Sequence, residues 1–118
     1  MSKLVEFDWI KRNDGTSEFE DFLNALPEKD CAKLLATIEN VETEGIAVAI
    51  KMKWVRKLEK DLFEIRSKQG SDIQRALYFH NIGKEYMITH GFSKKTDKTP
   101  KQEINHAKMM MKKYGEIR

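Results

Sequence analysis

Residues 73–92 narrow the possible folds more than any other stretch, because two strand-like segments flank a turn signal. The first segment, "IQRALYFH" at 73–80, is rich in apolar and aromatic residues and has the strongest strand character in the chain. The second, "EYMITHGF" at 85–92, follows "NIGK", which is typical of a hairpin turn. The pattern therefore predicts a β-hairpin within an antiparallel sheet.

Three further strands are expected from shorter signals. "KLVEFDWI", within the first ten residues, alternates its side chains as a half-buried strand does. Two short apolar runs, roughly 53–58 and 61–67, lie on either side of a charged turn at Glu59 and Lys60. Together with the hairpin they predict a mostly antiparallel sheet.

The remaining segments have helical spacing. Ser17 and Glu20 form a capping box before a short helix that ends at Pro27. A second helix follows and ends near Gly45, so the two should form a helical hairpin. The final helix has Thr99 as its expected N-cap, followed by a first-turn proline. Its expected apolar stripe contains Ile104, Ala107, Met111 and Tyr114.

The expected order is β-α-α-β-β-β-β-α. This order predicts a single α+β domain over residues 1–118, with a mostly antiparallel sheet packed on an N-terminal helical hairpin and a C-terminal helix. No apolar run approaches the roughly 20 residues that a membrane span needs, and the N-terminus resembles neither a signal peptide nor an anchor. The lone Cys31 suits a reducing cytoplasm and is expected to be a packed core thiol.

Charge is divided unequally along the chain. Residues 1–50 carry 5 basic and 11 acidic residues, a net charge of −6, whereas residues 51–118 carry 17 and 8, a net charge of +9. This asymmetry indicates a polyanionic partner for the basic half, although lysines that only solubilise a surface would give the same composition.

Strand alternation assigns the polar residues of the sheet to faces. Arg75 should share a face with Leu77 and Phe79, and Glu64 should share a face with Arg66. In the last strand, four residues should lie on one common face: Tyr86, Ile88, His90 and Phe92. An arginine among apolar residues indicates either an ion pair of Glu64 with Arg75 or Arg66, or a concave basic site.

Three sequence blocks carry a family resemblance: "LFEIR", "IQRALYF" and "ITHGFSKKTDKTPKQEI" followed by Ala107. Over residues 62–107 the chain resembles the RelE/HigB superfamily of bacterial toxins, and within it the phage-derived HigB-like branch. The stretch "GFSKKTDKTP" is its most specific block. The resemblance implies a RelE-like fold, a cognate helix-turn-helix antitoxin, and metal-independent cleavage of messenger RNA in the ribosomal A site.

The resemblance also implies roles for particular residues. Arg66 and Arg75 fall at active-site positions, where guanidinium groups would grip phosphate oxygens. Lys94 and Lys95 fall where basic residues line the same cleft, either as proton-transfer groups or as phosphate contacts. No cofactor is expected, because the reaction needs no metal and no Cys/His spacing resembles a ligand set.

His90 is open to two interpretations, and the remaining basic residues form a second group. His90 could transfer a proton or could pack against the C-terminal helix. A second basic group is expected to contact RNA: Lys51, Lys53, Arg56 and Lys57, with Lys98 in the motif. Trp54, which lies among them, is expected to be a core residue.

Three functions remain in competition. The first is a ribosome-dependent endoribonuclease toxin. The second is a ParE-like relative that poisons gyrase without RNA chemistry, and the third is an RNA-binding module without catalysis. Retention of Arg66, Arg75, Lys94 and Lys95 together favours the nuclease.

Overall fold

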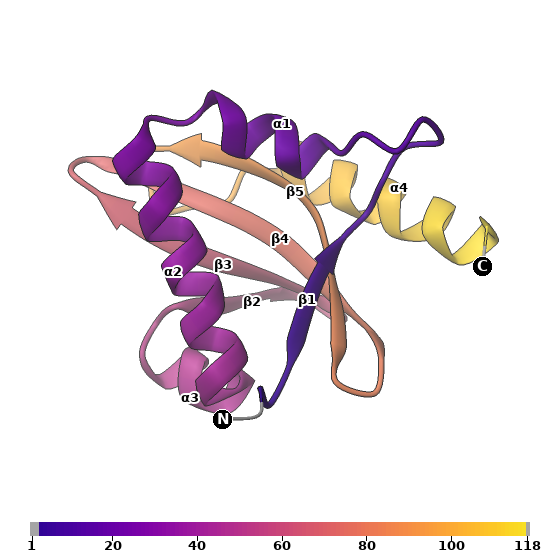
Figure 1. The fold of residues 1–118 in the computed structure, drawn as a ribbon, viewed down its shortest axis with the longest axis horizontal. Coiled ribbons are helices and arrows are strands. Elements are labelled where there is room, and N and C mark those ends of the chain that lie inside the picture. The colour runs from indigo at the N-terminus through magenta and orange to yellow at the C-terminus, as the bar shows by residue number, and fades with distance from the viewer. Residues whose placement is uncertain (1–2, 118) are drawn as a thin grey trace.

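The computed structural model describes residues 3–117, in which five strands form one sheet with the order β1-β5-β4-β3-β2 (Figure 1). The strands are β1 (Glu6–Trp9), β2 (Val55–Glu59), β3 (Leu62–Gln69), β4 (Asp72–Ile82) and β5 (Glu85–Lys94). Neighbours run antiparallel except β1, which runs parallel to β5. The predicted α+β class, with a mostly antiparallel sheet, is confirmed.

Four helices accompany the sheet in the described part of the chain: α1 (Glu18–Ala25), α2 (Glu28–Glu44), α3 (Ile46–Lys51) and α4 (Lys101–Ile117). The Ser17 side chain caps α1 by accepting hydrogen bonds from the backbone N–H groups of Phe19 and Glu20. Gly45 ends α2 at a φ of 88°, a conformation that favours glycine. The same glycine starts α3, which the sequence did not predict because its six residues are too few for a periodic pattern.

The sheet has helices on both faces (Figure 1). On one face, α1 lies over β5 and α2 lies over β3, and this larger core contains Phe19, Leu34, Ile65, Tyr78 and Ile88. On the other face, α4 packs on β4 and β5 around Leu62, Leu77, Phe92 and Ala107. Cys31, expected in the core, is only half-buried. No helix within residues 3–117 is long and apolar enough to cross a membrane.

A β-bulge in β5 changes which side chains reach each face. Leu77 pairs with His90, whereas the next residue, Tyr78, pairs with Ile88, so Thr89 is an extra residue in β5. Ile88 therefore faces the α1–α2 core, and His90 and Phe92 face α4. The predicted common face for the four residues of this strand is wrong, because one extra residue reverses the alternation after it.

Candidate functional site

Three arginines and one glutamate gather on the α4 face of the sheet. In the strand register, Arg56 of β2 pairs with Glu64 of β3, and Arg66 of β3 pairs with Arg75 of β4. Paired residues point to the same face, and residues two apart on one strand do so as well. The sheet therefore positions all four side chains beside the loop that connects β5 to α4.

Glu64 is the buried acidic partner of the arginines in this cluster. Its side chain is 0% exposed, and its Oε1 lies 2.9 Å from Arg66 Nε. Its Oε2 lies 3.9 Å from an Arg75 nitrogen and accepts a 2.7 Å hydrogen bond from the Thr99 hydroxyl. Both of the ion pairs that the sequence offered as alternatives are thus present. Such partners are needed because a buried carboxylate without them is strongly destabilising.

Thr99 and Pro100 connect this cluster to α4. The prediction of Thr99 as the N-cap is wrong, because α4 begins at Lys101 and Pro100 precedes it; the Thr99 hydroxyl donates to Glu64. The carbonyl of Pro100 accepts from the backbone N–H groups of Glu103 and Ile104, which are the first backbone hydrogen bonds of the helix. The helix is therefore anchored to the sheet through the same buried carboxylate that pairs the arginines.

Arg75 is fully buried and binds backbone rather than solvent. Its guanidinium donates to the carbonyl oxygens of Thr96, Asp97 (3.3 Å) and Lys98 (3.1 Å), and it lies 5.6 Å from the Phe92 ring centroid. Burial lowers the pKa of Arg75, and Glu64 opposes that shift. With the loop in this position, Arg75 supports the 96–98 backbone and has no open path to a phosphate.

Asp97 lies on the solvent side of the cluster, where its carboxylate binds two of the arginines. Arg56 Nη2 donates to both carboxylate oxygens at 3.0 and 2.9 Å, and Arg66 Nη1 donates to one of them at 2.8 Å. These hydrogen bonds, first from Arg66 and then from Arg56, lower the pKa of Asp97 to about 2. We call Arg56 and Arg66 the arginine clamp. Sequence reasoning missed Asp97, although it is the single acidic residue in "GFSKKTDKTP".

A basic hollow adjoins the clamp where β3 extends beyond the start of β2. It has a volume of about 560 Å³, and among its described lining residues Asp97 is the one acidic residue. Its basic lining residues are Lys33, Lys53, Arg66 and Lys68. Trp54 lines it and is also half-buried against the larger core, which agrees with the expected core position.

The predicted lysines lie around this region at the surface. Lys94 ends β5, and Lys95 and Lys98 belong to the following loop; all three are exposed. Among the second basic group, Lys53 lines the hollow, Arg56 is in the clamp, and Lys51 and Lys57 are exposed nearby in sequence. The structure thus brings together Arg56, Arg66, Arg75 and Lys53, and leaves the other lysines in solvent.

His90 is separated from the clamp and packed against α4. It is buried, with Nε2 3.0 Å from Glu103 Oε1 and Nδ1 3.0 Å from the Thr89 hydroxyl. Its ring lies 4.7 Å from that of His106, which pairs with Glu18 at 2.9 Å. Burial lowers the pKa of His90 despite the opposing effect of Glu103. Of its two proposed interpretations, the structure matches packing against the C-terminal helix.

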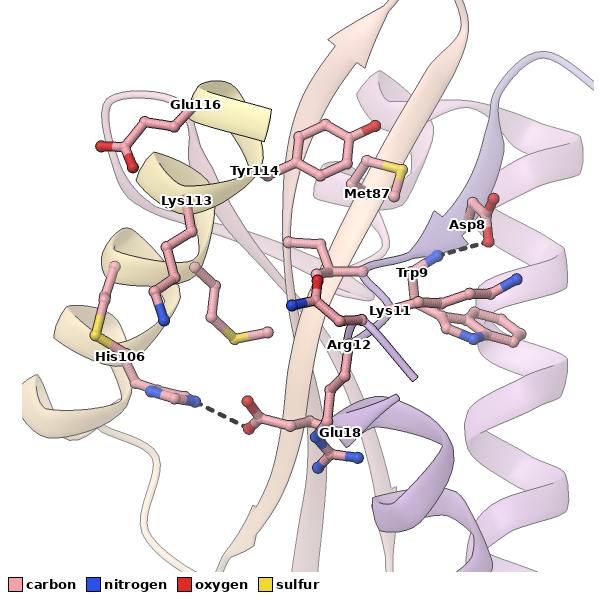
Figure 2. A pocket seen from close by; sticks show the side chains of 14 residues that line it. Asp8, Trp9, Lys11, Arg12, Glu18, Met87, His106, Lys113, Tyr114 and Glu116 are labelled. Carbon is pink, nitrogen blue, oxygen red and sulfur yellow. Dashed lines mark hydrogen bonds and ion pairs between the residues drawn. The ribbon is translucent and has the colours of Figure 1, made fainter. Parts of the chain in front are cut away.

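A larger cavity of about 750 Å³ lies elsewhere, between α4, β1 and the segment before α1 (Figure 2). Figure 2 shows the His106–Glu18 contact bridging its two walls. Its charged lining is mixed: Asp8, Glu18 and Glu116 against Lys11, Arg12 and Lys113. None of the predicted site residues lines it. The smaller basic hollow is therefore the candidate site, because its charge and its arginines suit an anionic ligand.

Comparison with known proteins gives one family. The family described as "Phage derived protein Gp49-like (DUF891)" matches residues 21–112, a segment that contains the clamp, Glu64, Arg75 and Asp97. No curated protein matches the chain.

Proposed function

Because the chain belongs to the Gp49-like family of phage-derived proteins, we propose that it is the toxin of a toxin–antitoxin pair and cleaves messenger RNA on the ribosome. The sequence resemblance to RelE/HigB toxins supports this proposal over residues 62–107. Its expected partners are a helix-turn-helix antitoxin and the ribosome with its messenger RNA, in the cytoplasm.

The observation that carries the proposal is the arginine clamp beside a basic hollow. Two guanidinium groups on a rigid sheet already hold the two oxygens of a carboxylate, in the manner in which they would hold phosphate oxygens. Such preorganised charge stabilises a phosphate that gains negative charge in the transition state. We assign this role to Arg66, with Arg56 beside it.

The other residues support this chemistry in different ways. Arg75 acts as a positioning residue, since it holds the 96–98 backbone that carries Asp97. Lys94 and Lys95 are exposed at the end of β5, so they can reach bound RNA. We assign them one of two roles: they contact a phosphate, or they transfer the proton that leaves the 2′-hydroxyl or the proton that the 5′-oxygen receives. We assign His90 to the packing of α4. The acidic N-terminal half keeps the helical hairpin away from RNA, except where Lys33 of α2 lines the hollow.

Induction of the chain alone in a bacterium tests the proposal. Growth should stop, and primer extension on cellular messenger RNA should show new 5′ ends within coding regions. The Arg66→Gln variant, expressed at the same soluble level, should permit growth and give no new ends. Normal growth with soluble wild-type protein would contradict the toxin role, and arrest with intact messenger RNA would contradict the nuclease role and favour gyrase as the target.

One observation favours a second candidate, an RNA-binding module without catalysis. Arg75 and His90, two of the five expected catalytic residues, are both buried and engaged with other protein groups. Binding of RNA without any cleavage on programmed ribosomes would support that alternative.

A further inference from the structure

The geometry points to a phosphate seat between Arg56 and Arg66, which Asp97 fills in the free chain and which a phosphodiester of single-stranded RNA takes by displacing the Asp97 side chain. The class of ligand rests on the proposed function, whereas the seat and its occupant rest on contacts within the chain. The hollow beside the seat receives the neighbouring nucleotide.

The Asp97 carboxylate stands in for a phosphate. Its two oxygens receive three N–H contacts from two guanidinium groups, at 2.8, 2.9 and 3.0 Å. Guanidinium groups donate to carboxylate oxygens and to phosphate oxygens, so donors that converge on a carboxylate can also bind a phosphate. The occupant therefore reports where an incoming phosphate would bind.

Asp97 can leave the seat without moving the loop. The Asp97 side chain is 77% exposed, so water can solvate the carboxylate as it leaves Arg56 and Arg66. Its backbone, by contrast, is held by Arg75, Arg66 Nη2 and Arg56 Nη1, all of which donate to the Asp97 carbonyl. Rotation of the side chain into water would empty the seat while the main chain keeps its place.

The surroundings favour a polyanion once the seat is open. Lys33, Lys53 and Lys68 line the adjoining hollow, and without the Asp97 carboxylate no acidic side chain remains among its described lining residues. Trp54 lines it as well, and an indole provides a face on which a base can stack. A hollow of about 560 Å³ also exceeds the space that one inorganic phosphate needs. These features select a nucleotide chain over a free anion.

Asp97→Asn is the central variant, because it keeps the side-chain shape and removes the competing charge. Binding of a fluorescein-labelled RNA hexanucleotide would be measured by anisotropy at fixed salt. We expect Asp97→Asn to bind about fivefold more tightly than wild type, the upper range for releasing an exposed ion pair. Asp61→Asn is the matched control: it removes the same charge from the exposed turn before β3 and should change binding by less than about twofold.

A double variant tests whether the gain passes through the clamp. Arg56→Gln should weaken RNA binding more than Lys60→Gln, which removes one positive charge from the exposed turn before β3. The Asp97→Asn/Arg56→Gln protein should bind RNA only slightly more tightly than the Arg56→Gln protein, far short of the fivefold gain expected in wild type. The reason is that without Arg56 there is no intact seat for which Asp97 competes. Arg56 is on the surface side of the cluster, so the Arg56→Gln comparison stands even if Asp97→Asn does not fold.

Three results would overturn the inference. They are equal affinities for Asp97→Asn and Asp61→Asn, a gain that survives undiminished in the double variant, and equal affinities for Arg56→Gln and Lys60→Gln. Inorganic phosphate should compete more weakly than unlabelled hexanucleotide; equal competition per phosphate would make this a site for the free anion. Because all of these are binding measurements, a chain that binds as expected but cuts no messenger RNA would refute the proposed function alone.

Discussion

Replacing Glu64 with Gln should destabilise the chain more than any conservative change at its surface. The substitution preserves volume but removes the carboxylate that pairs with Arg66 and Arg75, whose side chains are 13% and 0% exposed. Removing one partner of a buried ion pair costs about 3–5 kcal/mol, because the remaining charge stays buried. Arg66 keeps Asp97 as a second partner, so we expect the lower end, about 3 kcal/mol. For a domain of this size that corresponds to a fall in Tm of about 12 °C.

Urea unfolding followed by far-ultraviolet circular dichroism at neutral pH would measure this loss. Glu59→Gln is the matched control, since Glu59 pairs with Lys108 at 3.0 Å on the surface. That change should cost less than about 1 kcal/mol. If Glu64→Gln cost no more than Glu59→Gln, Glu64 would not be compensating the buried arginines, and our account of the cluster would be refuted.

Three further changes test other parts of the structure. Lys94→Gln with Lys95→Gln should abolish cleavage of messenger RNA on programmed ribosomes with no change in Tm, because both side chains are exposed; unchanged cleavage would make them solubilising residues. The pKa of His90 is lowered by burial, so the unfolding free energy should be highest above the ordinary histidine value of about 6.5 and decline as pH falls through it. His90→Gln should flatten that decline in urea titrations while His80→Gln, at an exposed position, should not; equal slopes in both variants would refute this. Gly91→Ala should cost about 1–3 kcal/mol, because the added methyl would lie 2.3 Å from Phe22 Cδ2, whereas Gly115→Ala meets nothing within 4 Å and should cost nothing; equal Tm values would refute the close contact.

The parts of the fold that were predictable are those with local signals. Ser17 was identified as a cap because its hydroxyl can reach the first N–H groups of its own helix. Gly45 was identified as a helix end, and the hairpin of β4 and β5 was identified from apolar strands around a turn. In each case the residues that determine the structure are neighbours in the sequence.

The parts that were missed depend on distant partners. Thr89 has no feature that marks it as the extra residue of β5, since a bulge is defined by the register with β4. Asp97 meets Arg56 and Arg66 across separations of 41 and 31 residues, which no local pattern reveals. Arg75 was correctly placed beside apolar residues, and its pairing with Glu64 was one of the alternatives left open, but its attachment to the 96–98 backbone required the path of the loop.

The parallel pairing of β1 with β5 has a consequence for how the chain folds. Strands β2 to β5 form a meander of near neighbours, and the arginine clamp, Glu64, Arg75 and Asp97 all lie within that meander and the loop after it. Residues 6–9, in contrast, pair with residues 85–88, the most distant strand pairing in the sheet. Because closing a long loop is slow, β1 should join the sheet late. During synthesis β1 is made before the other four strands, whereas β5, its partner in the sheet, is made after them.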